Sequence, residues 1–519
     1  MSIRRPKPAR LSRPVGVEAG VDGKSRGTAD PRMTEAIRGL WQRWPELSAR
    51  GPAPGWLLPG VALLAFAVAF GLVVEWRTTV GLTGALLLVP FAAGTGLRLY
   101  AALEILRRPP TGPRHRRLPS PRMPGPLPSY AVLVALYDEA EVLPTLLSHL
   151  LAFDYPPDRL EIVLVLEARD TATRAAATRL QLPRHVRIVV VPNGGPRTKP
   201  KALNYALTTV TSDLVVVYDA EDRPEPDQLR MAAAAFARGS PRLACLQARL
   251  NIYNPDAGFF ARQFTLEYSA LFDGLLPALE RLRCPIPLGG TSNHFRTTML
   301  RAAGAWDPYN VTEDADLGIR LARMGLTTGT LASTTWEEAP THRRVWLGQR
   351  RRWLKGWMQT WLVHMRRPGR LAAELGLLQL VAVQAVMTGV LVSALAYPIF
   401  LALLAAMVVS GELGPARLVG TGAWLWWAAL ANLTLGLWAP MLAASLAVVR
   451  RGRAWLVWHV PLMVIYWLFV SWAGYRALIE LGYKPFHWEK TRHGAPHGAR
   501  RGYRRRRART AAAKVPSSR

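Results

Sequence analysis

Long uncharged apolar runs constrain the fold of this chain of 519 residues more than any other feature of its sequence. Two runs lie near the N-terminus, at 56–74 and 80–97, and each is close to the length that crosses the hydrocarbon core of a bilayer. Three more follow in the C-terminal part, at 375–409, 421–448 and 454–481. The chain is therefore expected to contain a bundle of membrane-spanning helices.

The charge of the chain agrees with a membrane location. Half of the residues are hydrophobic, yet the formal net charge is +31. Basic residues flank membrane spans on the cytoplasmic side and attract anionic lipid. Nucleic-acid binding is the other explanation of so basic a chain, but the long uncharged runs argue against it, and we expect no nucleic-acid partner. Cys245 and Cys284 lack metal-ligand spacing and are expected to be free thiols.

Arginine residues predict the orientation of the spans. They follow the second run closely from Arg98 on, so the positive-inside rule places the N-terminal arm and the segment after Arg98 in the cytoplasm. The Arg-rich C-terminal tail is expected there too, which requires an even number of crossings. Four spans result if the first two C-terminal runs cross and the third, rich in aromatic residues, lies in the interface. Splitting the run at 375–409 at Pro398 would give six.

Between these regions the chain alternates between short apolar strands and amphipathic helices. Strands are expected at 130–136, 160–166, 186–191 and 214–218, and helices at 139–151, 171–182 and 201–209. Alternation at this spacing predicts a mostly parallel, Rossmann-like α/β sheet with right-handed crossovers. Neither a G-x-G-x-x-G nor a Walker sequence follows a strand, which disfavours a dinucleotide oxidoreductase and a P-loop ATPase.

Carboxylates crowd the end of the strand 214–218, which continues as Asp219-Ala-Glu221-Asp222. Open α/β sheets bind ligands at the carboxyl ends of their strands. Asp219 and Glu221 project to the same side, because side chains alternate along an extended segment. Two hard oxygen ligands of this kind can hold Mg²⁺ or Mn²⁺ against a diphosphate. A solvated acidic turn is the alternative interpretation.

Other stretches carry groups suited to the same site. They are the acids Asp138, Glu139 and Asp170 after the first two strands, Lys199 and Lys201 at the start of a helix, Thr312-Glu313-Asp314 before an amphipathic helix, and Gln349-Arg-Arg-Arg352-Trp353 in a cluster of Trp and Arg. A helix N-terminus already favours anions, and the two lysines strengthen that preference. Taken singly, these features could be solvated turns, a helix cap or a lipid-facing basic patch.

Together and in this order, the motifs resemble those of glycosyltransferase family 2, in the branch of membrane-embedded polysaccharide synthases that includes cellulose and hyaluronan synthases. The resemblance covers about 130–365. It implies a GT-A catalytic domain that uses a nucleotide-diphosphate sugar together with Mg²⁺ or Mn²⁺. The pair Asp219 and Glu221 matches the family's metal-binding Asp-x-Asp, with Glu in the second place.

The resemblance also implies roles for the other motifs. Asp138, Glu139 and Asp170 would hold the nucleoside, although the family has a second acid where this chain has Arg169. Asp314 would act as the general base. Lys199 is a further donor-binding residue, and we expect it at the donor phosphates.

The motif Gln-x-x-Arg-Trp would serve both substrates. Gln349 and Arg352 would engage the diphosphate, and Trp353 would offer an apolar face to the acceptor sugar, near Glu313. The loop 288–296 would lie near the acceptor, with Thr291, Ser292, Asn293 and His294 as sugar contacts, or it could be a polar surface loop. A looser match at 485–499 resembles the family's gating loop, with Thr491, Arg492 and His493 near the diphosphate; a basic juxtamembrane linker is the alternative.

In order along the chain, we expect a disordered basic arm at 1–55, two transmembrane helices at 56–108, a proline-rich linker at 109–129, a cytoplasmic GT-A domain at 130–342, interfacial amphipathic helices at 343–374, transmembrane or interfacial helices at 375–484, the gating loop at 485–499 and a disordered basic tail at 500–519. The predicted function is an inverting, metal-dependent transfer of a hexose, glucose, from a UDP-sugar to a growing β-linked polysaccharide at a bacterial-type inner membrane. Partners would be the donor, a glycan acceptor, anionic lipid and accessory export or periplasmic subunits. The alternatives are a non-processive glycolipid-forming transferase and a non-catalytic membrane scaffold.

Overall fold

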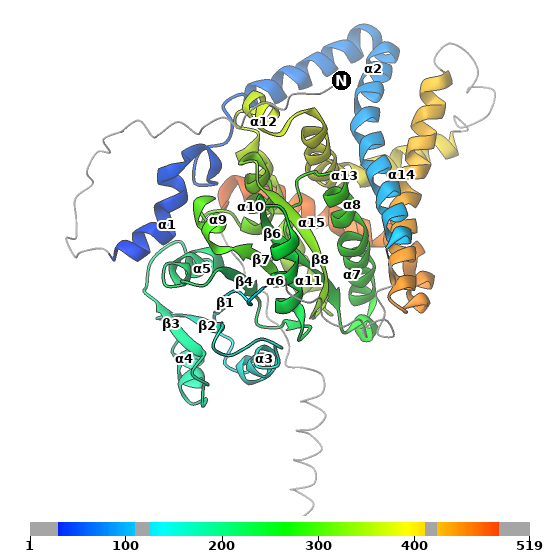
Figure 1. The fold of residues 1–519 in the computed structure, drawn as a ribbon. Helices are drawn as coiled ribbons and strands as arrows, with labels where there is room; N and C mark the ends of the chain where they lie inside the picture. The colour runs from blue at the N-terminus through cyan, green and yellow to red at the C-terminus, as the bar shows by residue number, and fades with distance from the viewer. Residues whose placement is uncertain (1–29, 109–124, 411–422, 487–519) are drawn as a thin grey trace, which may run out of the picture.

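A computed structural model describes residues 30–108, 125–410 and 423–486 of the chain. Figure 1 shows a sheet domain whose helices cover both faces, beside long helices that extend away from it. Among the described residues, the sheet has eight strands in the order β3-β2-β1-β4-β7-β6-β8-β5. The strands are β1 Tyr130–Leu136, β2 Leu160–Glu167, β3 Val186–Val191, β4 Leu214–Tyr218, β5 Arg223–Pro224, β6 Leu243–Ile252, β7 Asn293–Arg296 and β8 Thr327–Glu337.

The half of the sheet that precedes residue 219 is parallel. β1 pairs in parallel with β2 and β4, and β2 pairs in parallel with β3. β7 then runs antiparallel between β4 and β6, and β8 runs parallel to β6. The predicted fold, a mostly parallel α/β sheet of the GT-A type combined with long apolar helices, is confirmed.

The predicted strands at 130–136, 186–191 and 214–218 have the observed bounds, and β2 is one residue longer. The helices differ more at their ends. α3 is Leu143–Leu150, α4 is Thr171–Thr178 and α5 is Lys199–Leu207. α3 and α5 each have a proline in the first turn, where its missing N–H costs nothing. These two helices therefore begin one residue before a proline, and the prolines predict their starts better than the neighbouring acidic or basic residues do.

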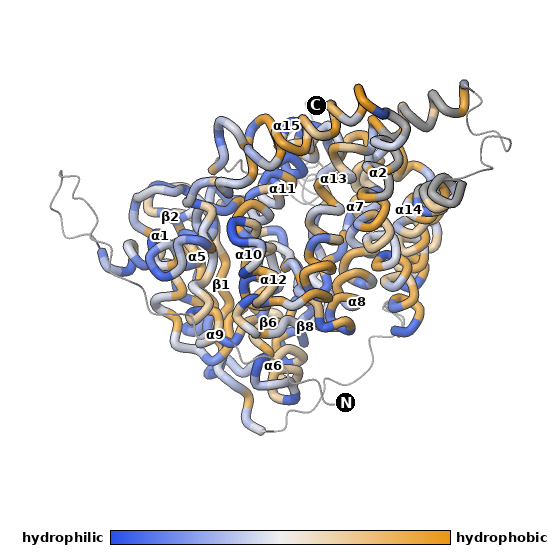
Figure 2. Tube along the Cα trace, turned by 90° about the horizontal axis from the view of Figure 1, so that it is seen from above, coloured by the Kyte–Doolittle hydropathy of each residue, from blue (hydrophilic) through white to orange (hydrophobic). Residues whose placement is uncertain are grey.

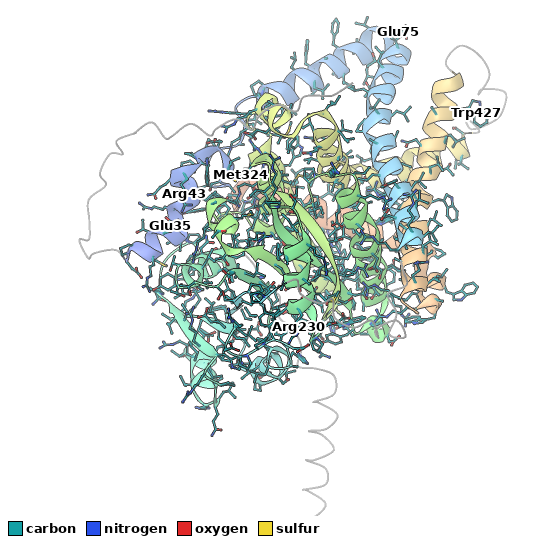
Figure 3. All side chains as sticks on the ribbon, viewed as in Figure 1. Glu35, Arg43, Glu75, Arg230, Met324 and Trp427 are labelled. Atoms are coloured by element: carbon teal, nitrogen blue, oxygen red, sulfur yellow. The ribbon has the colours of Figure 1, made fainter. Side chains whose placement is uncertain are left out.

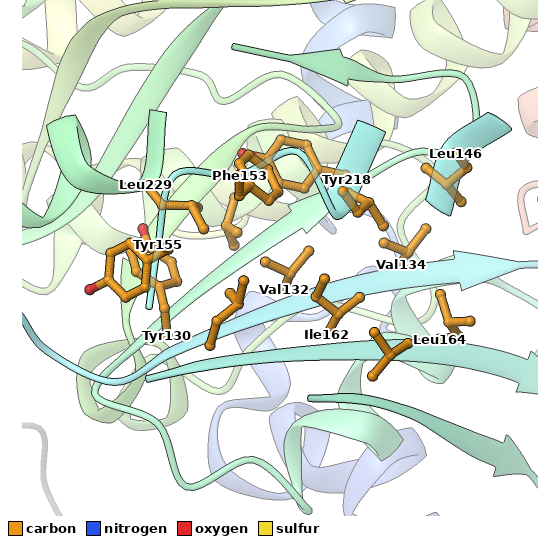
Figure 4. Packing of buried hydrophobic residues seen from close by; sticks show 14 of the residues in the cluster. Tyr130, Val132, Val134, Leu146, Phe153, Tyr155, Ile162, Leu164, Tyr218 and Leu229 are labelled. Carbon is orange, nitrogen blue, oxygen red and sulfur yellow. The ribbon is translucent and has the colours of Figure 1, made fainter. Parts of the chain in front are cut away.

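Both faces of the sheet are buried, as a parallel sheet requires. Val132, Val134, Ile162 and Leu164 point to one face and pack with residues of α3 and α6 (Gln228–Arg238), as Figure 4 shows. The alternate residues of the same strands pack on the other face with α5 and α9 (Thr297–Ala302). Two-sided burial explains why these strands are continuous apolar runs.

The second half of the domain is helical around β6 to β8. Its elements are η3 Pro255–Ala257, α7 Phe259–Ala270, the π-helical turn η4 Leu271–Leu275, α8 Leu276–Arg281 and α10 Glu313–Arg323. α7 carries the aromatic residues Phe264 and Tyr268, which pack against helices from the C-terminal part of the chain. This half therefore joins the sheet to the long helices.

Four helices of the described residues are long and apolar enough to cross a membrane: Leu57–Glu75, Leu377–Ile399, Leu430–Arg450 and Ala454–Tyr483. The first belongs to α2 (Leu57–Arg107), which bends at Glu75, labelled at the top of Figure 3. The predicted run at 80–97 lies within the second part of α2. Figure 2 shows that α2, α13 (Leu377–Val409) and α14 (Ala423–Arg450) are largely hydrophobic.

The C-terminal helices agree with one of the sequence-based expectations and differ from another. α13 continues through Pro398 as one helix, which removes the basis of the six-span alternative. The run predicted to lie in the interface forms η6 (Ala454–Leu462) and α15 (Met463–Tyr483), and it meets the same length and hydropathy criteria as the other three candidate spans.

The segment 343–374, predicted to form interfacial helices, packs against other helices of the chain. α11 (Arg343–His364) packs between α10, α13 and α15, followed by α12 (Pro368–Leu375). Trp346, Arg350 and Lys355 are each less than a tenth exposed. The interfacial position of this segment stays a prediction. The charges of α11 are satisfied by partners from distant segments, which sequence periodicity does not reveal.

Part of the N-terminal arm is ordered, contrary to the disorder predicted for 1–55. Residues 31–43 form α1 (Pro31–Arg43), followed by η1 (Pro45–Leu47). Ala36 and Leu40 are buried, and Asn204 of α5 donates a hydrogen bond to the Ala36 carbonyl. This part of the arm is ordered because α1 has an apolar face that covers α5.

Candidate active site

A lysine joins the end of the central strand to a glycine loop. Lys199 begins α5, and its ammonium lies 2.5 Å from Asp219 Oδ1, directly after β4. The same ammonium donates a 2.8 Å hydrogen bond to the Gly290 carbonyl. Burial alone would lower the pKa of Lys199, but the charges of Asp219 and Glu313 raise it above its ordinary value. Lys199 therefore stays charged among carboxylates from two segments, the end of β4 and the start of α10.

The start of α10 enters the same site. A side chain at Gly290 would bring its Cβ to 3.3 Å from Asp314 Oδ2, a tighter contact than most Cβ atoms make, so glycine favours this close approach of the backbone to that carboxylate. Burial raises the pKa of Asp314 to about 6, while the nearby charges of Lys199 and Arg352 act to lower it. Burial, followed by the charge of Asp314, raises the pKa of Glu313 to about 7. Raised pKa values of neighbouring buried carboxylates are typical of acid–base sites.

Asp222 is fully buried beneath Asp219. One of its oxygens accepts a 2.7 Å hydrogen bond from the Asp219 backbone N–H and another from the Thr291 hydroxyl. Its other oxygen, Oδ1, is buried and has no hydrogen-bond partner among the described residues. An unpartnered carboxylate oxygen is costly to bury, so a ligand that approaches here gains an acceptor that the protein has not used.

The donor set fits a hard divalent cation. Asp219, Glu221 and the free oxygen of Asp222 are all carboxylate ligands, which suit Mg²⁺ or Mn²⁺. Within the described residues, no group of three His, Cys, Asp or Glu side chains converges closely enough to form a complete cation cage. Mg²⁺ ordinarily retains waters and substrate phosphates as ligands, so a site completed by a diphosphate agrees with this geometry.

The predicted nucleoside acids lie together at the ends of β1 and β2. Asp170 caps α4 through the Thr173 N–H and accepts a 2.5 Å hydrogen bond from the Asp138 N–H. The Glu139 N–H donates to the Thr173 hydroxyl. Asp138 has a φ of 56°, a left-handed conformation that an Asp tolerates better than most residues. Asp170 thus fixes the loop that presents Asp138 and Glu139.

Arg169, which stands where the family pattern has an acid, stacks on an aromatic ring. Its guanidinium carbon lies 4.6 Å from the ring centroid of Tyr137. The Arg169 Nε is buried and has no hydrogen-bond partner among the described residues. The pair adds a cationic, planar surface beside the nucleoside acids.

The motif Gln349–Trp353 lies on α11, facing the same region. Arg352 acts on the pKa values of both Glu313 and Asp314. Trp353 packs against Phe264 with ring centroids 5.6 Å apart, and stacks near Tyr268. Gln349 Oε1 is buried without a hydrogen-bond partner among the described residues. α11 therefore brings this motif to the acids of α10 and to an aromatic surface from α7.

The loop residues predicted to contact the acceptor are buried, and their role as sugar contacts stays a prediction. Thr291, Ser292, Asn293 and His294 are each no more than 2% exposed. Ser292 donates to or accepts from Thr335, 2.6 Å away, and His294 lies 2.6 Å from the Tyr130 hydroxyl. Burial lowers the pKa of His294 to about 3, so it is neutral. Asn293 and His294 belong to β7 inside the sheet, where their polar groups find partners. Residues 291–294 are therefore not exposed as in a polar surface loop.

Sequence reasoning missed one acidic residue of the site, Glu337, and the partner of one basic residue beside it, Arg350. Glu337, the last residue of β8, has a raised pKa because of burial and then of the charges of Asp222 and Glu221. Arg350 forms two hydrogen bonds with Glu267, at 2.8 and 2.6 Å, and lies 4.8 Å from the ring centroid of Trp353. Glu337 is an acid at a strand end, the signal used for Asp219, but its strand was not predicted. The predicted gating-loop residues Thr491, Arg492 and His493 lie outside the described residues.

Comparison with known proteins agrees with these features. Residues 128–356, which include Asp219, Asp314 and the motif Gln349–Trp353, match the family model described as glycosyltransferase-like family 2. This segment is therefore similar to family 2 glycosyltransferases.

Curated relatives of this segment differ in the acceptors that their names imply. A beta-monoglucosyldiacylglycerol synthase from Synechocystis sp. is 30% identical over 46% of this chain and 50% of its own length. A cellulose synthase 1 catalytic subunit (UDP-forming) from Komagataeibacter xylinus is 26% identical over 48% of this chain and 34% of its own length. The chain thus spans half or less of the length of these relatives.

A solved structure is also similar to this chain. It is the mannosyltransferase PcManGT from Pyrobaculum calidifontis in complex with GDP-Man and Mn²⁺, 20% identical, with a TM-score of 0.46 over 77% of this chain and 98% of that one.

Proposed function

We propose that this protein is an integral membrane glycosyltransferase that transfers glucose from UDP-glucose to an acceptor hydroxyl with inversion of configuration. One observation carries the proposal: Lys199 links Asp219 to the Gly290 backbone, which lies against Asp314. A cationic diphosphate site and a buried carboxylate base thereby lie side by side within the segment that matches the family 2 model. The printed name of the UDP-forming relative supports the choice of nucleotide.

Asp314 is the proposed proton acceptor. The acceptor hydroxyl must lose its proton as its oxygen attacks the anomeric carbon, and a positioned carboxylate contributes to such a step about 100- to 10,000-fold. With a pKa of about 6, Asp314 is largely ionised at neutral pH and is a stronger base than an exposed aspartate. Attack on one face of the donor, opposite the leaving diphosphate, converts an α-linked donor into a β-linked product.

The leaving diphosphate requires positive charge. Lys199 and Arg352 are the cations that this chain supplies beside Asp314. Asp219 and Glu221 would hold Mg²⁺ or Mn²⁺, which when bound neutralises the charge that develops on the diphosphate. Such charges stabilise a transition state most where water is excluded. Asp138, Glu139 and Asp170 would hold the nucleoside at the neighbouring strand ends.

Two acceptors are each favoured by an observation. Similarity to a cellulose synthase subunit, and candidate membrane spans beside the domain, support extension and export of a β-linked polysaccharide. The 30% identity to a monoglucosyldiacylglycerol synthase supports a glycolipid product made one sugar at a time. In both cases Trp353 would offer its ring to the apolar face of the acceptor sugar. The positive-inside rule favours a cytoplasmic catalytic domain and cytoplasmic termini.

Metal-dependent release of UDP tests the proposal. The full chain in lipid nanodiscs is incubated with radiolabelled UDP-glucose, with and without Mn²⁺, beside an Asp314→Asn variant. We expect release that requires the cation and the carboxylate. Label that partitions into organic solvent identifies a glycolipid, and label that stays as ethanol-insoluble material identifies a polysaccharide. Absence of release with every UDP-sugar would instead favour a non-catalytic membrane scaffold.

A further inference from the structure

One face of β8 carries polar side chains toward the acids of the site. Thr335 lies 2.6 Å from the Ser292 hydroxyl and accepts a hydrogen bond from Gln228 Nε2 at 3.2 Å. Glu337 is two residues further along the strand and projects to the same face, because side chains alternate. The polar face of β8 therefore ends in a carboxylate.

The pairing of β5 with β8 places that carboxylate beside Asp222. The two strands are antiparallel, with Pro224 opposite Thr335 and Arg223 opposite Trp336. Continuing this register by one residue puts Asp222 opposite Glu337. Directly opposed residues of an antiparallel pair lie on the same face with Cβ atoms about 4.5–5.5 Å apart. Two acidic side chains from distant parts of the chain thus become neighbours.

Among the described residues, the charge of Lys199 acts on both Glu337 and Asp222, but its ammonium is already paired with Asp219. The Glu337 carboxylate forms no ion pair there, and Asp222 Oδ1 has no hydrogen-bond partner. Two other basic residues near the pair stack on aromatic rings: Arg223 of β5 on Tyr253, and Arg453, which donates a hydrogen bond to the Ile252 carbonyl at the end of β6, on Trp336. Asp219, Glu221 and Asp222 all act electrostatically on Glu337. Like charges held this close call for a counter-ion.

We propose that Glu337 is a further carboxylate ligand of the divalent cation, reaching it from β8 together with Asp222, on the side opposite Asp219. The proposal rests on the proposed function for the identity of the cation. The cation would then link the end of β4 to the end of β8, the strand that directly precedes α11 in the chain. Binding of the cation would then fix the position from which α11 presents Gln349 and Arg352.

Direct measurement of Mn²⁺ binding tests the proposal. The full chain in nanodiscs is titrated with Mn²⁺ in the presence of UDP, and free Mn²⁺ is followed by its electron paramagnetic resonance signal, with a titration of UDP alone subtracted. Glu337→Gln is expected to weaken binding about tenfold, the scale typical of losing a group that supports a metal site. Glu337→Asp should recover part of the loss. Glu338→Gln is the matched control, since Glu338 hydrogen-bonds Tyr253, and should bind as the unaltered protein does.

A second readout separates a ligand from a structural side chain. Without cation, Glu337→Gln removes a like charge, so its melting temperature should equal or exceed that of the unaltered protein, and the increase produced by Mn²⁺ should shrink. A lower melting temperature without cation, or Mn²⁺ affinity within twofold of the unaltered protein, would overturn the proposal. Mn²⁺ binding that depends on Glu337 in a protein that releases no UDP would leave this inference standing and reject the proposed function.

Discussion

Charged side chains at the carboxyl edge of the sheet differ from those at the joint between the sheet domain and the long helices. At the joint, each of three acids has a cation: Arg451 and Arg249 face the buried Asp273, Arg350 faces the partly exposed Glu267, and Lys355 faces the buried Glu480. At the sheet edge, by contrast, an oxygen of Asp222 has no partner, and burial raises the pKa values of Glu313 and Asp314. Paired charges hold segments together, whereas charges left uncompensated are available to a ligand.

The comparison predicts that the two regions respond differently to loss of one carboxylate. At the edge, Asp314→Asn should lower the rate of UDP release about 1,000-fold, because the acceptor hydroxyl loses its proton acceptor. Folding should be unaffected, since replacing an acid that is costly to bury removes no ion pair. Initial rates and thermal melts of the same preparation measure both effects. A large drop in melting temperature would place Asp314 with the structural charges instead.

At the joint, Asp273→Asn should act on stability. The change leaves Arg451 and Arg249 buried without their shared carboxylate, which costs about 3–5 kcal/mol for a buried pair. We expect a large fall in the melting temperature, followed by tryptophan fluorescence in nanodiscs. Activity of the remaining folded fraction should be close to normal.

The double variant Asp273→Asn with Arg451→Met sharpens this test. Removing both partners should destabilise the protein less than Asp273→Asn alone, because fewer buried charges are then unpaired. Equal or larger destabilisation in the double variant would contradict a role limited to charge pairing.

The pH dependence of the rate of UDP release should reflect the ionisation of Asp314 at the sheet edge. Asp314 must be ionised to accept a proton, so activity should rise with pH and reach half its maximum near the pKa of about 6. Arg352 acts to lower the pKa of Asp314, so Arg352→Gln should move this acid limb to higher pH as well as weaken the donor. Arg351→Gln is the control, because Arg351 pairs with Glu480, 3.0 Å away. An acid limb that stays in place in Arg352→Gln would show that the two groups do not interact.

The contrast also explains what the sequence could and could not predict. β1, β4 and the acids that follow them were predicted because an apolar run and its polar end are local features. Glu337 was missed because its place beside Asp222 depends on the pairing of β5 with β8, more than a hundred residues apart. The joint was missed for the same reason: Arg451 and Asp273 are 178 positions apart, and α11, rich in Arg and Trp, has the composition of an interfacial helix. The roles assigned to Asp138, Gln349 and Trp353 stay predictions.

The smallest expected effect concerns Arg169 at the nucleoside end of the edge. Its stacking on Tyr137 contributes about 1 kcal/mol if the nucleobase or ribose packs on the same pair. Arg169→Ala should therefore raise the KM for UDP-glucose about fivefold and leave kcat unchanged, because the residue lies away from Asp314 and binds donor and transition state equally. Arg174→Gln is the matched control, since Arg174 donates to the Ala168 carbonyl on the same loop. A fall in kcat without a change in KM would mean that Arg169 acts on the reacting centre, and the charges of the edge would then have to be regarded as one coupled set.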